Sequence, residues 1–384
     1  MAKELNPFIV TGKIEPEYFC DRNTESSKLV KSVTNGNNIV LISPRRMGKT
    51  GLIRFFYDKP EIRDDYYTFF IDILHTSSLR ELTYVLCREI FDQLQPRGRK
   101  LVDSFLQTLR SLSGKFGFDI STGSPTFSIE LGDIERPEFL LGEIFYYLEQ
   151  ADKPCIVAID EFQQIAKYPE KNVETLLRGY IQKSANCNFI YAGSERHMMQ
   201  EMFVSSARPS YHSADMLELK AIAKEIYVGF AMEKFGNAGK CIQKEDVEWV
   251  YDLFCGHTFY MQKTLNEAFS DTLQGEECNR KMLCTAIENQ VNSYDVVFRE
   301  VLSNVPEKQK ELLYAIALDG NAMAITSAAF IRRHHLSSSS SVQAAARKLI
   351  EKELVSENNK VYSVQDKFFG LWMQMQIGPG KPLE

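Results

Sequence analysis

The hydrophobic positions of this chain change their spacing along the sequence, and the changes divide it into three parts. In the first part, apolar residues gather in short runs that end in small or polar residues. Such runs predict strands buried on both faces, as in a parallel sheet covered by helices. The runs lie at residues 39–42, 66–71, 155–159 and 188–192. Helical spacing at residues 51–56, 79–95 and 173–183 predicts helices between these strands, and therefore an α/β fold.

The second and third parts have different patterns. Residues from about 216 to 300 show helical spacing, which predicts a helical domain. The clearest segments there are 223–235, 244–254 and 260–273. After Pro306, three predicted helices at 307–318, 326–334 and 341–352 precede a hairpin that turns at residues 357–359. This order is typical of a winged helix. The predicted domains are residues 1–215, 216–304 and 305–384.

An irregular insertion separates the second and third apolar runs. Residues 116–121 and 126–131 alternate in polarity around residues 122–125, which predicts a β-hairpin. The hairpin could be an interaction element, or it could be a flap that packs on the core.

Composition agrees with a globular protein of two or three domains. The chain has 384 residues, of which 44% are hydrophobic and 25% charged. We find no apolar stretch long enough to span a bilayer and no apolar core of a signal peptide near Met1, so we expect a cytoplasmic protein without a membrane partner. The eight cysteines form no Cys-x-x-Cys pair and are expected to be reduced. A net charge of −6 argues against overall attraction to nucleic acid but leaves room for a local basic face.

The first apolar run leads directly into a sequence that is typical of a phosphate-binding loop. Gly48, Lys49 and Thr50 follow the run at the start of a predicted helix. Gly48 lets the backbone approach a phosphate, Lys49 can reach its oxygens, and the Thr50 hydroxyl can coordinate Mg²⁺. The usual pattern has glycine where this chain has Ser43, although Ser followed by Pro44 can also turn. The alternative is an ordinary turn that caps a helix.

The third apolar run ends in two adjacent carboxylates, Asp160 and Glu161. A buried strand would deliver them to the carboxyl edge of the sheet, which is the Walker B pattern. Asp160 would then hold Mg²⁺, and Glu161 would polarise the water that attacks the γ-phosphate. Alternatively, these are two solvated acids at an exposed strand end.

Ser194 follows the fourth run in the same way. Ligands of open parallel sheets bind outside the carboxyl ends of the strands, where a γ-phosphate sensor would lie. Ser194 could also be a simple helix cap.

Together these motifs resemble the archaeal-type ATPase family of the AAA-related signal-transduction (STAND-like) P-loop NTPases, over most of the chain. The family's phosphate loop is matched by Pro44-Arg45-Arg46-Met47-Gly48-Lys49-Thr50, and its Walker B pair by Asp160-Glu161-Phe162. Its Gly-Ser strand end is matched by Gly193-Ser194, and its aromatic-Asp-Arg element by Phe19-Cys20-Asp21-Arg22-Asn23-Thr24-Glu25. Its closing signature is similar to Asp366-Lys367-Phe368-Phe369-Gly370-Leu371-Trp372.

The resemblance implies a fold, a ligand and a set of site residues. It implies a P-loop sheet flanked by helices, then a helical lid that closes over the base, then a winged helix. The ligand is ATP or ADP with Mg²⁺, held at Thr50 and Asp160, while Lys49, Asp160, Glu161 and Ser194 form the catalytic set. The implied nucleotide contacts are Phe19, Arg22, Pro44, Arg45, Arg46, Met47, Gly48, Lys49, Thr50, Gly51 and His257.

Two positions depart from the family pattern. The arginine that often follows the sensor strand is replaced by Ser213, and nearby Arg208 could substitute for it or be an exposed structural residue. The family's Gly-x-Pro in the lid is Gly256-His257-Thr258, so His257 is read either as a lid residue near the nucleotide or as a polar helix start.

Two functions are consistent with these residues. The first is an Mg²⁺-dependent ATPase that acts as a molecular switch. The second is a nucleotide-gated protein- or DNA-binding module with negligible hydrolysis, which the missing arginine at Ser213 motivates. From residue 305 onward there are ten Lys and Arg against eight Asp and Glu, so the winged helix is only weakly basic. Its partner could be a protein, a second copy of the chain or duplex DNA.

Overall fold

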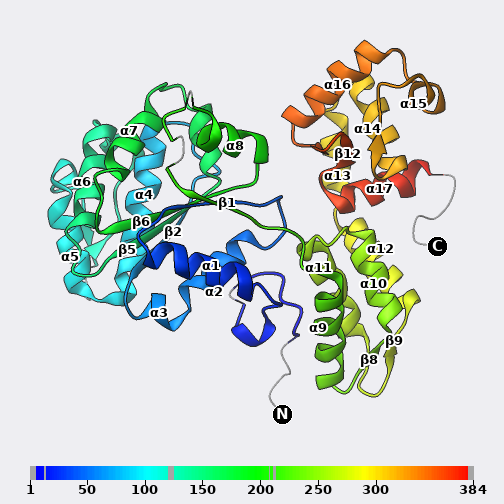
Figure 1. Ribbon diagram of the computed structural model, residues 1–384, viewed down its shortest axis with the longest axis horizontal. Coiled ribbons are helices and arrows are strands. Elements are labelled where there is room, and N and C mark those ends of the chain that lie inside the picture. Colours follow the sequence, from blue (N-terminus) through cyan, green and yellow to red (C-terminus); the bar gives the residue numbers. More distant parts are fainter. Residues whose placement is uncertain (1–5, 13, 120–124, 207, 211–212, 379–384) are drawn as a thin grey trace. The chain divides into compact units, whose positions relative to one another are not determined.

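The chain folds into two compact units (Figure 1). The computed structural model describes residues 6–12, 14–119, 125–206, 208–210 and 213–378. One unit is Lys13–Ile222, and the other combines Met1–Gly12 with Ala223–Glu384. The chain therefore passes between the units twice, after Gly12 and after Ile222.

A five-stranded parallel sheet forms the centre of the unit Lys13–Ile222. The strands are β1 (Ile39–Ile42), β2 (Tyr67–Asp72), β5 (Cys155–Asp160), β6 (Cys187–Gly193) and β7 (Asp215–Glu218). Their order is β2-β5-β6-β1-β7, and every neighbouring pair is parallel. The four predicted strands and the α/β fold class are confirmed. The fifth strand, β7, was not predicted, and the predicted domain boundary after residue 215 lies inside it.

Helices cover both faces of the sheet because successive strand residues point to opposite sides. Ile39 and Leu41 pack in one core cluster, whereas Val40 and Ile42 pack in the other. The first cluster is covered by α1 (Asn23–Thr34), α2 (Lys49–Tyr57) and α3 (Pro60–Arg63). The second is covered by α4 (Leu79–Leu94), α5 (Arg99–Thr108), α6 (Pro137–Glu149), α7 (Val173–Ile181) and α8 (Arg196–Val204). Short 3-10 turns are η1 (Pro16–Tyr18), η2 (Gln95–Arg97), η3 (Arg110–Leu112), η4 (Leu131–Asp133) and η5 (Phe162–Lys167).

The insertion before β5 packs on the core. It holds a short antiparallel pair, β3 (Gly117–Phe118) with β4 (Pro125–Thr126), whereas residues 120–124 of the predicted hairpin lie outside the described residues. The Phe127 ring lies 5.5 Å from the ring of Phe91 on α4, and Ile129 is buried in the same core cluster. These contacts favour the packing flap over the interaction element.

The second unit begins with a helical part at the position of the predicted lid, and we keep the name lid for residues 224–293. Its elements are α9 (Lys224–Asn237), β8 (Cys241–Ile242), α10 (Lys244–Leu253), α11 (Thr258–Asp271), β9 (Glu277–Cys278) and α12 (Arg280–Ser293). The N-terminal segment belongs to this lid, because Phe8 is fully buried against Phe235 and Phe269. The Asn266 side chain donates to the Phe8 carbonyl at 2.7 Å and fixes the segment on α11. Residues 6–12 therefore belong to the second compact unit, although the chain continues from them into the unit that holds the sheet.

A winged helix follows the lid in the same compact unit. Its elements are α13 (Asp295–Ser303), α14 (Glu307–Asp319), β10 (Ala322–Met323), α15 (Ala328–Arg333), α16 (Ser339–Glu351), β11 (Val355–Asn358), β12 (Val361–Val364) and α17 (Lys367–Ile377). The three predicted helices and the hairpin are confirmed. The sequence signature at residues 366–372 attaches α17 to the lid. The Phe368 ring lies 4.9 Å from that of Tyr260 and 5.7 Å from that of Phe254, both in the lid. Within the winged helix, Trp372 donates to Asp295 of α13 at 2.9 Å.

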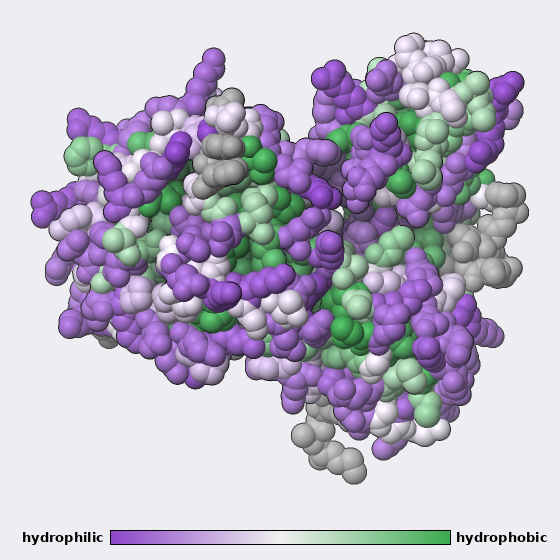
Figure 2. All heavy atoms as spheres, viewed as in Figure 1, coloured by the Kyte–Doolittle hydropathy of each residue, from purple (hydrophilic) through white to green (hydrophobic). Residues whose placement is uncertain are grey.

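Hydrophilic side chains cover most of the face drawn in Figure 2. Among the helices in the described part of the chain, none has the length and apolar character needed to cross a bilayer. The cytoplasmic location stays a prediction.

We expect Phe368→Ala to destabilise the lid and winged helix by about 3–5 kcal/mol, because it removes a buried aromatic ring and leaves a cavity. Both tryptophans of the chain, Trp249 and Trp372, belong to this unit, so denaturant unfolding followed by tryptophan fluorescence measures its stability. The matched control is Leu273→Ala, since Leu273 is 64% exposed in the same unit and should change the free energy of unfolding by less than about 0.5 kcal/mol. Equal stability of the two variants would contradict the packing role of Phe368.

Candidate active site

The loop between β1 and α2 has the backbone of a phosphate-binding turn. Gly48 adopts a φ of 88° immediately before α2, in the left-handed region that favours glycine. Ser43 is fully buried and does not have a positive φ. Its backbone N–H donates to the Gly193 carbonyl at 3.1 Å. Position 43 therefore does not need glycine in this chain, which explains how the departure from the usual pattern is tolerated.

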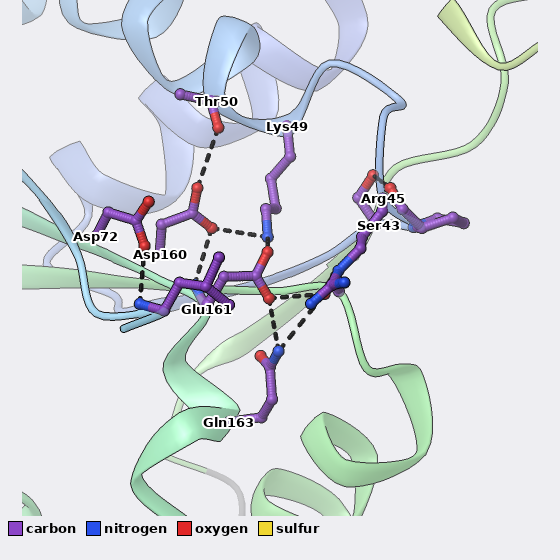
Figure 3. Close-up of polar contacts among 11 residues, drawn as sticks. Ser43, Arg45, Lys49, Thr50, Asp72, Asp160, Glu161 and Gln163 are labelled. Atoms are coloured by element: carbon purple, nitrogen blue, oxygen red, sulfur yellow. Dashed lines mark hydrogen bonds and ion pairs between the residues drawn. The ribbon is translucent and has the colours of Figure 1, made fainter. Parts of the chain in front are cut away.

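Two adjacent carboxylates, at the last residue of β5 and the residue after it, converge on the lysine of this loop (Figure 3). Lys49 Nζ lies 2.7 Å from Asp160 Oδ1 and 2.9 Å from Glu161 Oε1. The Thr50 hydroxyl donates to Asp160 Oδ2 at 3.0 Å. The alternative of two solvated acids is wrong, because the side chains of Asp160 and Glu161 are only 7% and 13% exposed.

Ser194 and a residue that was not predicted complete the polar cluster. The Ser194 hydroxyl and the Gln163 amide each donate to Glu161 Oε2 at 2.6 Å. Arg45 Nε lies 3.4 Å from the Ser194 oxygen, on the phosphate-loop side of the cluster. Seven residues from three segments of the chain thus meet at the carboxyl edge of the sheet.

The surroundings of Glu161 keep its carboxyl ionised. Burial raises the pKa of Glu161, but the charge of Lys49 and the hydrogen bonds from Ser194, Lys49 and Gln163 outweigh burial, so the pKa lies below its ordinary value. Glu161 also has a φ of 55°, which turns the chain sharply at the end of β5 into η5. The carboxylate is therefore a fixed, charged acceptor.

Gln163 was not predicted from the sequence, because a single glutamine three positions after the strand has no pattern of its own. The sequence feature connected with Gln163 is Gly193 on the neighbouring strand β6. A Cβ at Gly193 would lie 2.5 Å from Gln163 Oε1 and 2.5 Å from the sulfur of Met199, so no larger residue fits without displacing them. Asp72 ends β2 in register with Asp160, but its carboxylate accepts the N–H of Leu74 at 2.9 Å instead of joining the cluster.

Phe19 and Arg22 lie against the phosphate loop and α2. The Phe19 ring stacks on Phe55 of α2 with centroids 4.4 Å apart. Arg22 is 3% exposed and donates to the carbonyls of Met47 at 3.3 Å and Lys220 at 2.7 Å. These hydrogen bonds connect the start of α1 to the loop. A contact of Phe19 or Arg22 with adenine stays a prediction.

Other predicted positions have their own local contacts. His257 belongs to the second compact unit, where its Nδ1 lies 2.8 Å from the Phe254 carbonyl oxygen at the start of α11. Arg208 makes ion pairs with Glu201 at 2.5 Å and Glu174 at 3.6 Å. The hydroxyl of Ser213 donates to the Ser210 carbonyl, and residues 211–212 lie outside the described residues. These contacts support a structural role for Arg208.

The donor set at Thr50 and Asp160 fits Mg²⁺. This ion prefers oxygen ligands and is usually held by one or two protein oxygens together with substrate phosphates and water. The two side-chain oxygens, Thr50 Oγ1 and Asp160 Oδ2, are 3.0 Å apart at the start of α2. In the described residues there is no group of three or more His, Cys, Asp or Glu side chains that could hold a metal by themselves.

Comparison with known proteins agrees with this geometry. Residues 296–375 match the family described as a probable winged helix domain. The chain is similar in structure to a Walker-type ATPase of Pyrococcus abyssi, with 19% identity, a TM-score of 0.63, and coverage of 96% of this chain and 99% of that one. It is also similar to the ORC2 protein of Aeropyrum pernix in its ADPNP–ADP complexes, with 11% identity, a TM-score of 0.59, and coverage of 98% and 99%.

A third structure is the ORC1 protein of Aeropyrum pernix in complex with DNA, with 12% identity, a TM-score of 0.52, and coverage of 97% and 96%. At these identities the likeness shows the fold. A comparison with curated protein sequences gives no match. Residues 19–264, well over half of the chain, match the family described as an ATPase domain predominantly from Archaea, and the chain therefore belongs to this family of P-loop ATPases.

Proposed function

We propose that the chain is an Mg²⁺-dependent ATPase that acts as a nucleotide-driven switch. One observation carries the proposal: Lys49, Thr50, Asp160 and Glu161 are joined by contacts of 2.7 to 3.0 Å at one edge of the sheet. P-loop hydrolases need this combination of a phosphate-binding cation, magnesium ligands and a water-activating acid. The ADPNP–ADP complexes of the ORC2 protein support an adenine nucleotide as the ligand.

Each side chain has a separate role in the proposed hydrolysis. Backbone N–H groups around Gly48 and the Lys49 ammonium bind the phosphates, while Thr50 and Asp160 would hold Mg²⁺, which neutralises phosphate charge. Glu161 orients a water and accepts its proton as the water oxygen attacks the γ-phosphorus. The bond from that phosphorus to the bridging oxygen breaks, and ADP and phosphate leave. Ser194 hydrogen-bonds Glu161 and is proposed to sense the γ-phosphate.

We expect Glu161→Gln to lower the rate of phosphate release by at least about 100-fold, since an amide cannot accept the proton of the water. Nucleotide affinity, measured by fluorescence titration, should change by no more than a few fold, because Lys49 and the loop backbone remain. The matched control is Glu61→Gln on the exposed surface of α3, which should leave both quantities unchanged.

Two results would argue against hydrolysis at this site. Turnover that survives Glu161→Gln would remove Glu161 from the mechanism. A wild-type protein that binds ATP but releases no phosphate would favour the alternative, a nucleotide-gated module, which the serine at position 213 motivates.

The switch is proposed to move the lid and the winged helix together. The aromatic contacts of Phe368 with Phe254 and Tyr260 join the two elements, and both belong to one compact unit. The chain crosses between that unit and the ATPase unit next to Gly12 and next to Ile222. Rigid-body rotation about such connections is a common way for a protein to report nucleotide state.

Energy transfer from tryptophan to a mant-labelled nucleotide tests this motion. Both donors, Trp249 and Trp372, lie in the lid and winged-helix unit, whereas the acceptor would lie on the phosphate loop of the other unit. We expect different transfer efficiencies for mant-ATP and mant-ADP in the Glu161→Gln variant, which keeps the triphosphate intact. Lys49→Ala is the control for nucleotide bound elsewhere. Equal efficiencies for the two nucleotides would contradict the switch.

For the winged helix we propose a protein partner or a second copy of the chain. Several of its basic side chains are already paired with acids: Arg333 with Asp319 at 3.1 Å, and Arg347 and Lys348 with Glu351 at 3.7 and 2.6 Å. Paired cations contribute less to phosphate neutralisation than free ones.

Duplex DNA is the alternative partner, because the ORC1 protein was solved with DNA. A gel shift at about 150 mM salt should show no duplex affinity tighter than about 10 µM with either nucleotide. Tighter binding that is lost on Arg347→Ala and Lys348→Ala would contradict the proposal and assign the surface to DNA.

A further inference from the structure

The two oxygens of the Glu161 carboxylate have different partners. Oε1 contacts Lys49 Nζ at 2.9 Å. Oε2 accepts hydrogen bonds from Ser194 and Gln163, each at 2.6 Å. One oxygen is thus held by a long, flexible cation, and the other by two short polar side chains on neighbouring segments.

These two sets of partners differ in how easily they can be exchanged. Lys49 has a flexible four-carbon stem and three N–H donors, and a phosphate group competes for it directly. Ser194 and Gln163 carry no charge, so a phosphate group competes for them less strongly than it does for Lys49. A bound phosphate would therefore draw Lys49 from Oε1 while Oε2 stays fixed.

We propose that Gln163 is a positioning residue which, with Ser194, fixes Glu161 through Oε2 so that Oε1 becomes the oxygen offered to water when Lys49 engages phosphate. The inference rests on the proposed ATPase function and adds a specific role for a residue outside the catalytic set. It also couples phosphate binding to exposure of the Glu161 base, because Lys49 leaves Glu161 Oε1 when it binds phosphate.

The packing around Gln163 supports a fixed position for its amide. Gln163 is 1% exposed, and its segment is anchored by Phe162 and Ile165 in the core. Its Oε1 is buried and, within the described residues, has no hydrogen-bond partner. Leaving a buried acceptor unsatisfied costs free energy, so an apolar residue would be more stable at this position if the Gln163 Nε2 hydrogen bond to Glu161 had no function.

The close approach of β6 to Gln163 also supports a fixed position for the glutamine amide. Because Gly193 has no side chain, Gln163 Oε1 can occupy the space in which a Cβ at position 193 would lie. The next residue, Ser194, then meets the same carboxylate oxygen as the glutamine amide, and their two polar atoms are 3.5 Å apart. Strand β6 and turn η5 therefore place two donors on one oxygen.

Steady-state and single-turnover hydrolysis of Mg·ATP by Gln163→Met and Gln163→Glu tests the proposal. Methionine keeps the approximate volume but has no donor, whereas glutamate keeps the shape and repels Glu161. We expect kcat to fall by about 10- to 100-fold for Met and further for Glu, since misplacing a reacting group by about 1 Å has effects of this size. The Kd for nucleotide should stay within about threefold of wild type, because neither variant touches the loop that binds phosphate.

The matched control is Gln164→Met. Gln164 is the adjacent glutamine, and its amide donates to the Thr76 carbonyl at 3.1 Å instead of to Glu161. Its kcat should remain within about twofold of wild type. Thermal unfolding of all variants identifies loss of fold. If the Gln163 variants unfold, Ser194→Ala removes the other hydrogen bond to Glu161 Oε2 from a different segment of the chain.

The possible results distinguish failure of the Gln163 positioning role from failure of the ATPase assignment. If Gln163→Met and Ser194→Ala are folded and both turn over at the wild-type rate, the positioning role is overturned while the ATPase assignment stands. If Gln163→Met loses nucleotide affinity as much as turnover, the role is structural and the proposal also fails. If wild-type protein has no Glu161-dependent turnover, the proposed function itself fails.

Discussion

The ion pairs between Lys49 and the two acids at the end of β5 are the contact on which the site depends. Asp160 and Glu161 are adjacent carboxylates with side chains that are 7% and 13% exposed. Two like charges this close and this buried require a counter-charge, and Lys49 supplies it to both. The same lysine is the residue with which a P-loop binds phosphate. Neutralisation of the two buried acids and binding of nucleotide therefore involve one side chain.

The sheet topology explains how these residues meet although about 110 positions separate them. Strand β6 lies between β1 and β5, so the loop after β1, the acids after β5 and the serine after β6 all leave the same edge of a parallel sheet. The left-handed turns at Gly48 and Glu161 then direct the two chain segments toward each other. Helices on both faces keep the strands buried, which leaves this edge as the place where polar side chains can gather.

Much of this arrangement could be predicted from the sequence because it depends on strong local patterns. The buried strands are continuous apolar runs, and Gly48-Lys49-Thr50 and Asp160-Glu161 stand at their ends. Edge strand β7 could not be found in this way, since three of its four residues are exposed and no apolar run marks it. Phe8 is a lone aromatic whose place in the lid is set by tertiary packing. Gln163 becomes visible only when β6 and η5 are seen side by side.

A crystal structure of the protein with Mg²⁺ and ADPNP measures the central claim most directly. The account predicts phosphates against the backbone of residues 44–51, with Lys49 Nζ within hydrogen-bond distance of a phosphate oxygen and Glu161 Oε1 released from it. Glu161 Oε2 should keep its contacts with Ser194 and Gln163. Nucleotide bound away from this loop, or bound there while Lys49 still holds Glu161 Oε1, would contradict the account.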